Sequence, residues 1–139
     1  MVSVGLMLAC IVSAGAYLLA VSILLQLAER RFGFTRGVAA DLLESTGWVW
    51  IGMTFLMEVM FFVVIPTLAY SFFYVLLPFS GVRAGMAAGL FAFVLGATPA
   101  IMGLSVRVKL PMPFLLFILF SVLLKTAGCM IIIAWLYSL

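Results

Sequence analysis

The sequence contains no histidine, and only 8% of its residues are charged. Histidine is the commonest protein ligand of haem, zinc and copper, so the sequence predicts no metal site and no cofactor. The few charges form no basic stripe of the kind that nucleic-acid binding needs, and no nucleic-acid partner is expected. Soluble domains are about 25% charged, so the scarcity of charge also argues against a water-soluble fold.

Cysteine is scarce as well, and the residue sets of most enzymes are absent. Cys10 and Cys129 lie in separate apolar runs without a C-x-x-C motif. We expect both to be buried small hydrophobic side chains, with a disulfide between them as the alternative. No group resembles a nucleophile with its base, and no glycine-rich phosphate loop is present. The sequence therefore predicts a protein that is not an enzyme.

Apolar residues are abundant, at 68% of the chain with a mean hydropathy of +1.45. The apolar runs are continuous rather than alternating, which predicts membrane-spanning helices. We expect an all-α polytopic integral membrane protein, one transmembrane domain over residues 1–139 with four helices in a bundle. No Lys or Arg precedes the first run, which favours a retained helix over a signal peptide. The expected spans are about 2–27, 48–77, 84–104 and 113–138.

Two prolines fall inside these runs. Residues 47–78 would form ~48 Å of helix, which is too long for one straight span. Pro66 removes a backbone donor and clashes with the carbonyl of Phe62, so the second span should be kinked near Pro66. Pro99 should bend the third span in the same way, and the Thr98 hydroxyl could bond a carbonyl that this bend frees.

The segment from Thr35 to Thr46 differs in composition from the spans around it. On a helix its apolar and polar residues would lie mostly on opposite sides, which predicts a short interfacial amphipathic helix between spans one and two. A polar loop is the alternative. The apolar side would hold Val38, Ala39, Leu42 and Leu43, and the polar side Arg36, Asp41, Glu44 and Ser45.

The basic residues predict the orientation. The loops after the first and third spans share one side of the membrane and together carry five Lys or Arg, whereas the opposite side has only Arg83. The positive-inside rule places the five in the cytoplasm and both termini outside. In size and hydropathy the chain resembles small four-span proteins of bacteria, which implies a cytoplasmic (inner) membrane location. The five residues are Arg30, Arg31, Arg36, Arg107 and Lys109.

Small residues recur at helical spacing in two spans. Such stripes let helix backbones approach closely inside lipid. We expect spans one and three to pack together, or one stripe to make a subunit contact; a lining for a lipid or pigment tail is the alternative. The third span carries Gly85, Gly89, Ala92, Gly96, Ala100 and Gly103, and the first carries Gly5, Ala9, Ser13, Ala16 and Ala20.

Two charged residues, Glu58 and Lys125, lie within apolar runs. A charge at the bilayer centre costs at least ~2.5–3.5 kcal/mol, so it usually faces a partner or a water-filled cavity. Counting from the cytoplasmic ends of their spans places them ~15 and ~18 Å deep, at nearly one level. Ser121 and Thr54 are available neighbours, and the four residues form the predicted intramembrane polar site.

Several interpretations of this site remain open. The two charges could pair within one chain or across a subunit boundary and fix helix register. Glu58 could instead bind a proton or cation with Lys125 tuning its affinity, or both could hold a polar ligand or lipid headgroup. Glu58 could also be protonated, with Lys125 elsewhere.

We expect the protein to be a small non-catalytic membrane protein, either an accessory or assembly subunit of a membrane complex or a homo-oligomer. Its partners would be membrane lipids and other membrane subunits, or further copies of itself, since little of the chain lies outside the spans. The alternative is a proton- or cation-coupled channel or transporter that uses Glu58 and Lys125.

Overall fold

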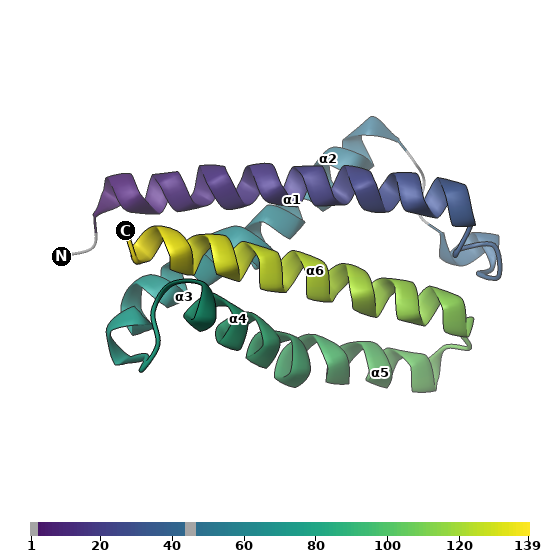
Figure 1. Ribbon diagram of the computed structural model, residues 1–139. Coiled ribbons are helices and arrows are strands. Elements are labelled where there is room, and N and C mark those ends of the chain that lie inside the picture. The colour runs from purple at the N-terminus through teal and green to yellow at the C-terminus, as the bar shows by residue number, and fades with distance from the viewer. Residues whose placement is uncertain (1–2, 44–46) are drawn as a thin grey trace.

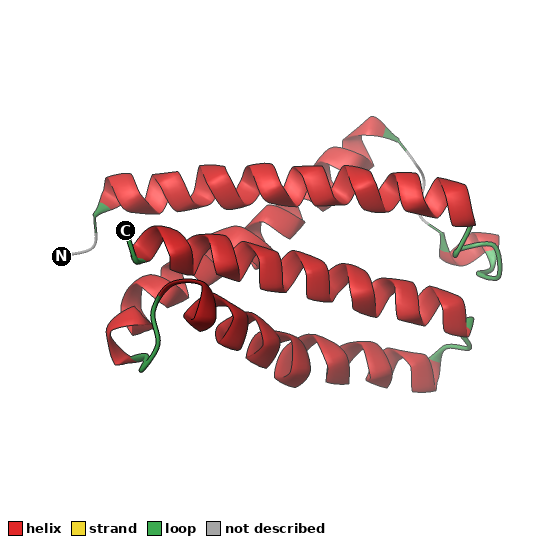
Figure 2. Ribbon diagram, viewed as in Figure 1, coloured by secondary structure: helices red, strands yellow, loops and turns green. Residues whose placement is uncertain are grey.

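The computed structural model describes residues 3–43 and 47–139, and every regular element in this part of the chain is helical (Figures 1 and 2). Four helices are long and apolar enough to cross a membrane, which agrees with the four spans expected from the apolar runs. They extend over Val4–Phe32, Trp48–Leu76, Gly81–Arg107 and Met112–Tyr137.

The first and last of these are uninterrupted α-helices, whereas the other two are divided. The second consists of α2, a π-helical turn, α3 and a 3-10 turn, and the third consists of α4, a π-helical turn and α5. The α-helices are α1 (Val4–Phe32), α2 (Trp48–Val59), α3 (Ile65–Phe73), α4 (Gly81–Ala92), α5 (Thr98–Arg107) and α6 (Met112–Tyr137).

Each π-helical turn directly precedes the helix that carries a proline. The turns are Met60–Val64, before Pro66, and Phe93–Ala97, before Pro99. A π turn adds a residue to the turn, which changes the backbone partners where a proline would clash with a regular helix. The Thr98 hydroxyl donates to the Phe93 carbonyl at 3.0 Å. The Thr98 backbone N–H bonds the same carbonyl, so the predicted hydroxyl bond forms, but to a carbonyl that the proline does not free.

Helix α6 is the centre of the arrangement. It packs against α4 along one side and against α1 along another, and Figure 1 shows it running between them. Helix α1 otherwise packs against α2, α3 and the π turn between them. The prediction that spans one and three pack directly against each other is therefore wrong, because α6 separates α1 from α4 over the described residues.

The first half of the third-span stripe makes the close contact with α6. A Cβ added at Gly85 would lie 2.5 Å from the Ile131 Cα, and one at Gly89 would lie 2.8 Å from the Ala127 Cα. Only glycine permits this approach of two backbones. A Cβ added at Gly96 or Gly103 would meet no atom within 4 Å.

The first-span stripe is not covered by any other part of the described chain. Its members are exposed on α1, whereas the opposite side of that helix is buried. The exposed residues are Gly5, Ala9, Ser13, Ala16 and Ala20.

The connection between α1 and α2 contains less helix than expected. Gly33 ends α1 in the left-handed conformation (φ 64°), and the segment that follows forms turns and one 3-10 turn, Ala40–Leu42. The predicted amphipathic helix over 35–46 is not confirmed. Its last three residues, 44–46, lie outside the described residues.

The tightest core lies where α1, α6, α4 and the π turn before α3 meet. Cys10 and Cys129 are both free and fully buried there, as expected of small apolar side chains, and the disulfide alternative is not present. The buried apolar residues of this core are Cys10, Ala14, Leu18, Val63, Tyr70, Ala84, Cys129, Met130, Ile133 and Ala134.

Candidate functional site

The two intramembrane charges form an ion pair within the chain. The Lys125 Nζ donates to the Glu58 Oε1 at 2.5 Å. The Ser22 hydroxyl donates to the other carboxylate oxygen, Oε2, at 3.2 Å. The side chains of Lys125 and Glu58 are only 11% and 24% exposed. Both oxygens of the carboxylate are therefore bonded by partners from two other helices.

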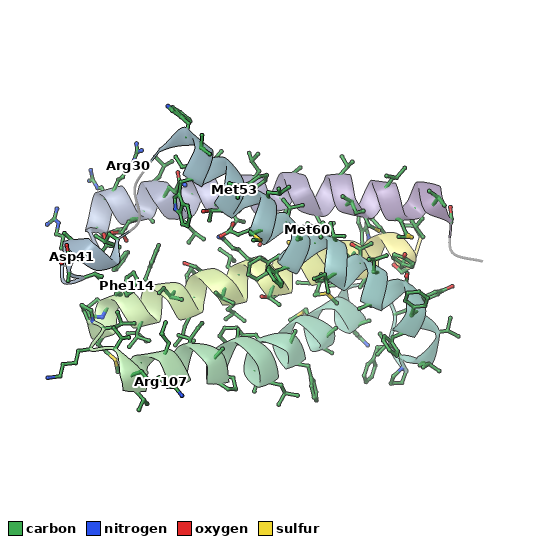
Figure 3. All side chains as sticks on the ribbon, turned by 180° about the vertical axis from the view of Figure 1, so that it is seen from behind. Arg30, Asp41, Met53, Met60, Arg107 and Phe114 are labelled. Atoms are coloured by element: carbon green, nitrogen blue, oxygen red, sulfur yellow. The ribbon has the colours of Figure 1, made fainter. Side chains whose placement is uncertain are left out.

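Three helices bring this pair together. Glu58 comes near the end of α2, just before the π turn, Lys125 comes from the middle of α6, and Ser22 comes from α1. Figure 3 shows the α2 segment that carries Met53 running obliquely over the other helices. The contacts thus tie α2, which otherwise makes few contacts, to the centre of the molecule.

A tyrosine fixes the rotation of α6 beside the lysine. The Tyr17 hydroxyl, on α1, donates to the Leu124 carbonyl at 2.9 Å. The Tyr17 ring occupies the space beside Gly128, where any Cβ would overlap it. Because Leu124 directly precedes Lys125, this contact helps to hold the lysine toward Glu58.

The ion pair lies in the wall of a cavity of about 770 Å³ between α1, α2 and α6. Each of the three helices contributes a pair of polar side chains four residues apart, so that both members of a pair lie on one helix face, and α1 contributes Glu29 in addition. Most of the remaining lining is leucine, isoleucine and aromatic rings. The pairs are Ser22 with Gln26, Thr54 with Glu58, and Ser121 with Lys125.

The cavity extends from the ion pair toward the end of α1 that carries the basic residues. We call this part, lined by Glu29, Gln26 and Trp50, the outer end of the cavity. It is open to the surroundings, because Gln26, Trp50 and Thr54 are exposed. In Figure 1, the first turns of α2 project away from α6 near this end.

The Glu29 carboxylate at the outer end is only partly bonded. Its Oε1 accepts from the Thr35 backbone N–H at 2.8 Å and from the Thr35 hydroxyl at 2.5 Å. Its Oε2 is buried and has no hydrogen-bond partner in the described structure. The Thr35 contacts fix the orientation of the carboxylate, and its second oxygen is enclosed by protein without a hydrogen bond.

The four residues of the predicted polar site all line this one cavity. Glu58 and Lys125 pair directly. Thr54 lines the same cavity and has no hydrogen bond to the pair, and the Ser121 hydroxyl donates to the Phe117 carbonyl of its own helix at 2.6 Å. Residues 58 and 125 are thus brought into contact, and 54 and 121 only into the same lining.

Sequence reasoning missed the contribution of α1. Ser22, Gln26 and Glu29 all line the cavity. Their spacing of four and three residues places them on one face of a helix, within a run that is otherwise almost entirely apolar. That spacing was the available signal.

The chain matches no protein-family model, no curated protein and no solved structure. Among the described residues, no three His, Cys, Asp or Glu side chains are grouped as a metal ion would need.

Proposed function

We propose that this protein is a non-catalytic integral membrane subunit that associates within the bilayer, either with copies of itself or with other subunits of a membrane complex. One observation carries the proposal. Gly96 and Gly103 continue the stripe that packs α4 against α6, yet nothing in the described chain approaches within 4 Å of their Cβ positions. The second half of the stripe is available to a helix of another subunit.

Helix association in lipid explains why such a face favours a partner. Lipid tails are as apolar as leucine, so helices associate through close packing rather than through exclusion of water. The same chain already uses Gly85 and Gly89 for such a contact with α6. A partner helix at Gly96 and Gly103 would repeat this mode of packing.

The ion pair has a structural role in this proposal. A buried pair adds little net stability, but it opposes any arrangement that separates its members. Glu58 with Lys125 and Ser22 would fix α2 relative to α1 and α6. The unit that associates would then have a defined shape.

Native mass spectrometry of gently extracted protein tests the assembly proposal. Wild-type protein is expected as an oligomer or in complex with another membrane subunit. Gly96→Leu and Gly103→Leu should each shift it toward the monomer. Gly15→Leu is the matched control, since Gly15 also has open space around its Cβ position but lies outside the stripe. A monomeric wild type, or an equal shift with the control, would overturn the proposal.

We also propose the membrane orientation expected from the sequence, with the four helices as a bundle, both termini outside and the basic loops in the cytoplasm of a bacterium. The supporting observation is that Arg30 and Arg31 lie in the last turn of α1 and Arg107 is the last residue of α5, and Figure 3 shows Arg30 and Arg107 at the same end of the molecule. Reporter fusions at Val38 and at the C-terminus should give opposite locations. A shared location would contradict the orientation.

A second candidate function is proton or cation transport through Glu58 and Lys125. The cavity favours it, because its polar pairs form a path from the open outer end to the ion pair. Flux into proteoliposomes tests it. Transport that Glu58→Gln abolishes in folded protein would support this function over the assembly role, whereas absence of flux from the wild type would eliminate it.

A further inference from the structure

We propose that the outer end of the cavity binds a lipophilic monovalent cation, namely an amine or quaternary onium group attached to an apolar body. The proposal depends neither on the assembly role nor on transport. It concerns Glu29 and the aromatic wall beside it, which the ion pair does not use.

The charge of the lining favours a cation. Two acids, Glu29 and Glu58, and one base, Lys125, line the cavity. Lys125 is bonded to Glu58, so these two charges cancel. Glu29 is left as the only uncompensated charge among the lining residues, and a ligand of charge +1 would make the occupied cavity neutral.

The bonding of Glu29 places that negative charge where a ligand could use it. Two donors from Thr35 hold Oε1, while Oε2 is buried without a partner. A buried oxygen without a partner loses its hydration without compensation, which is costly for a charged group. A cationic group at the outer end would stabilise this carboxylate by its charge, without needing a direct contact to the buried oxygen.

The rest of the lining favours a ligand with an apolar body. Cavities of roughly 300–1,000 Å³ hold drug-sized molecules, and this one measures about 770 Å³. Trp50, Phe55 and Phe117 contribute aromatic rings to it. Aromatic faces attract cations, tryptophan most strongly, and the same rings would pack against apolar groups.

The same features disfavour a hydrated metal ion. Hard cations such as Ca²⁺ take six to eight oxygen ligands, and several of these are usually carboxylates. Here a single carboxylate, that of Glu29, lies at the outer end, its unbonded oxygen is enclosed by protein, and the surrounding surface is mostly apolar. A large monovalent organic cation needs neither a coordination shell nor precise geometry.

Two probes of equal size and opposite charge test the proposal directly. Binding of tetraphenylphosphonium and of tetraphenylborate is measured by equilibrium dialysis against protein in phosphatidylcholine nanodiscs, with empty nanodiscs as the baseline. We expect saturable binding of the phosphonium, close to one per chain, and only baseline binding of the borate. Saturable binding of the borate, or none of either probe, would overturn the proposal.

Two variants locate the site. Glu29→Gln removes the charge but keeps an oxygen that can accept from Thr35, and it should weaken phosphonium binding about tenfold or more. Gly52→Leu should abolish binding, because Gly52 lines the cavity and has open space at its Cβ position. Gly15→Leu, outside the cavity, should bind like the wild type.

Folding of each variant is checked separately, so that a loss of binding is not confused with misfolding. Each is compared with the wild type by circular dichroism and by its melting temperature before binding is measured. Should Glu29→Gln fail to fold, Gly52→Leu carries the test alone. Unchanged binding in folded Gly52→Leu would place the cation elsewhere and overturn the proposal.

Discussion

At the scale of single residues, Glu58 and Lys125 lie within apolar spans and compensate each other's charge. Either charge alone would carry the cost of leaving water, whereas together they make a short, nearly buried contact that Ser22 completes. Pairing does not require that the two charges add net stability. It requires only that any structure in which the two charges are separated has a higher free energy.

A double-mutant cycle measures this coupling. Glu58→Gln and Lys125→Met should each lower the free energy of unfolding by ~3–5 kcal/mol, because each leaves a partner unpaired. The double variant should be much more stable than the sum of the two losses implies. The measurement is unfolding in mixed micelles, and additive losses would show that the residues act independently.

Gly128 makes a second prediction at this scale. Gly128→Ala places a methyl group where the Tyr17 ring lies, so we expect a loss of ~1–3 kcal/mol in the free energy of unfolding. Combining it with Tyr17→Leu should restore part of that loss, since the ring would then be absent. Gly15→Ala is the control and should be neutral or slightly stabilising. An equal loss in the control would show that the contact is unimportant.

At the scale of helices, both divided spans use the same device. Each has a π turn that is followed directly by the helix containing its proline. In each, the backbone N–H of the first residue after the turn bonds the carbonyl five residues earlier in the chain. The bond from Thr98 to Phe93 adds a side-chain donor to the second of these turns. The extra residue in the turn accommodates a proline inside a span that continues as α-helix on either side of it.

The glycine stripe of α4 and α5 provides a prediction for an element as a whole. Gly85→Ala should reduce the free energy of unfolding by ~1–3 kcal/mol, because its Cβ would collide with the α6 backbone. Gly96→Ala should leave it unchanged or raise it by up to ~1 kcal/mol, since alanine favours helix and no atom is near. Unfolding in mixed micelles distinguishes the two. Similar losses at both positions would contradict the division of the stripe.

At the scale of the whole molecule, α6 is the helix that contacts all three of the other spans in the described structure. It meets α4 through glycines, α1 through Tyr17 and the buried core, and α2 through the ion pair. The first turns of α2 are by contrast almost free of contacts, with Val49 83% exposed. Stability should therefore depend far more on α6 than on the start of α2.

Two substitutions compare these regions. Ile133→Ala, at a fully buried position of α6, should cost ~2–5 kcal/mol, because it removes core contacts and leaves a cavity. Val49→Ala on α2 should change the stability of the extracted monomer by no more than about 0.5 kcal/mol. Melting of both variants in the same detergent is the measurement. A comparable loss at Val49 would indicate that the start of α2 packs more closely against the other helices than the exposure of Val49 implies.

The number of spans and the pairing of charges were predictable for different reasons. Four apolar runs are a local property of the sequence, and hydrocarbon thickness converts run length directly into spans. Counting residues from the ends of the runs placed Glu58 and Lys125 at one depth, because helical rise is constant. The bond at Thr98 also followed from local sequence, since it links residues five apart.

Other features could not be predicted correctly from the sequence, because they depend on which helices are neighbours in the folded chain. Residues 35–46 show an amphipathic pattern, yet the described part forms only turns and one 3-10 turn, with Thr35 bonded to Glu29. The α1 side of the cavity was missed because Ser22 acquires its role only when α2 delivers Glu58 to it. The role of a polar residue in a span depends on the residue that it contacts on another helix, and the sequence alone does not identify that residue.

The sequence by itself determined that the chain is helical, that it has four apolar helices, and that two opposite charges share one depth. These follow from hydropathy and helical rise, which act within each run. Tertiary structure alone decided that α6 lies between α1 and α4, that Gly85 and Gly89 are used inside the chain while Gly96 and Gly103 are not, and that a cavity surrounds the ion pair. Small residues permit close packing with any helix, so the helix that packs against them is determined only by the tertiary arrangement of all the helices.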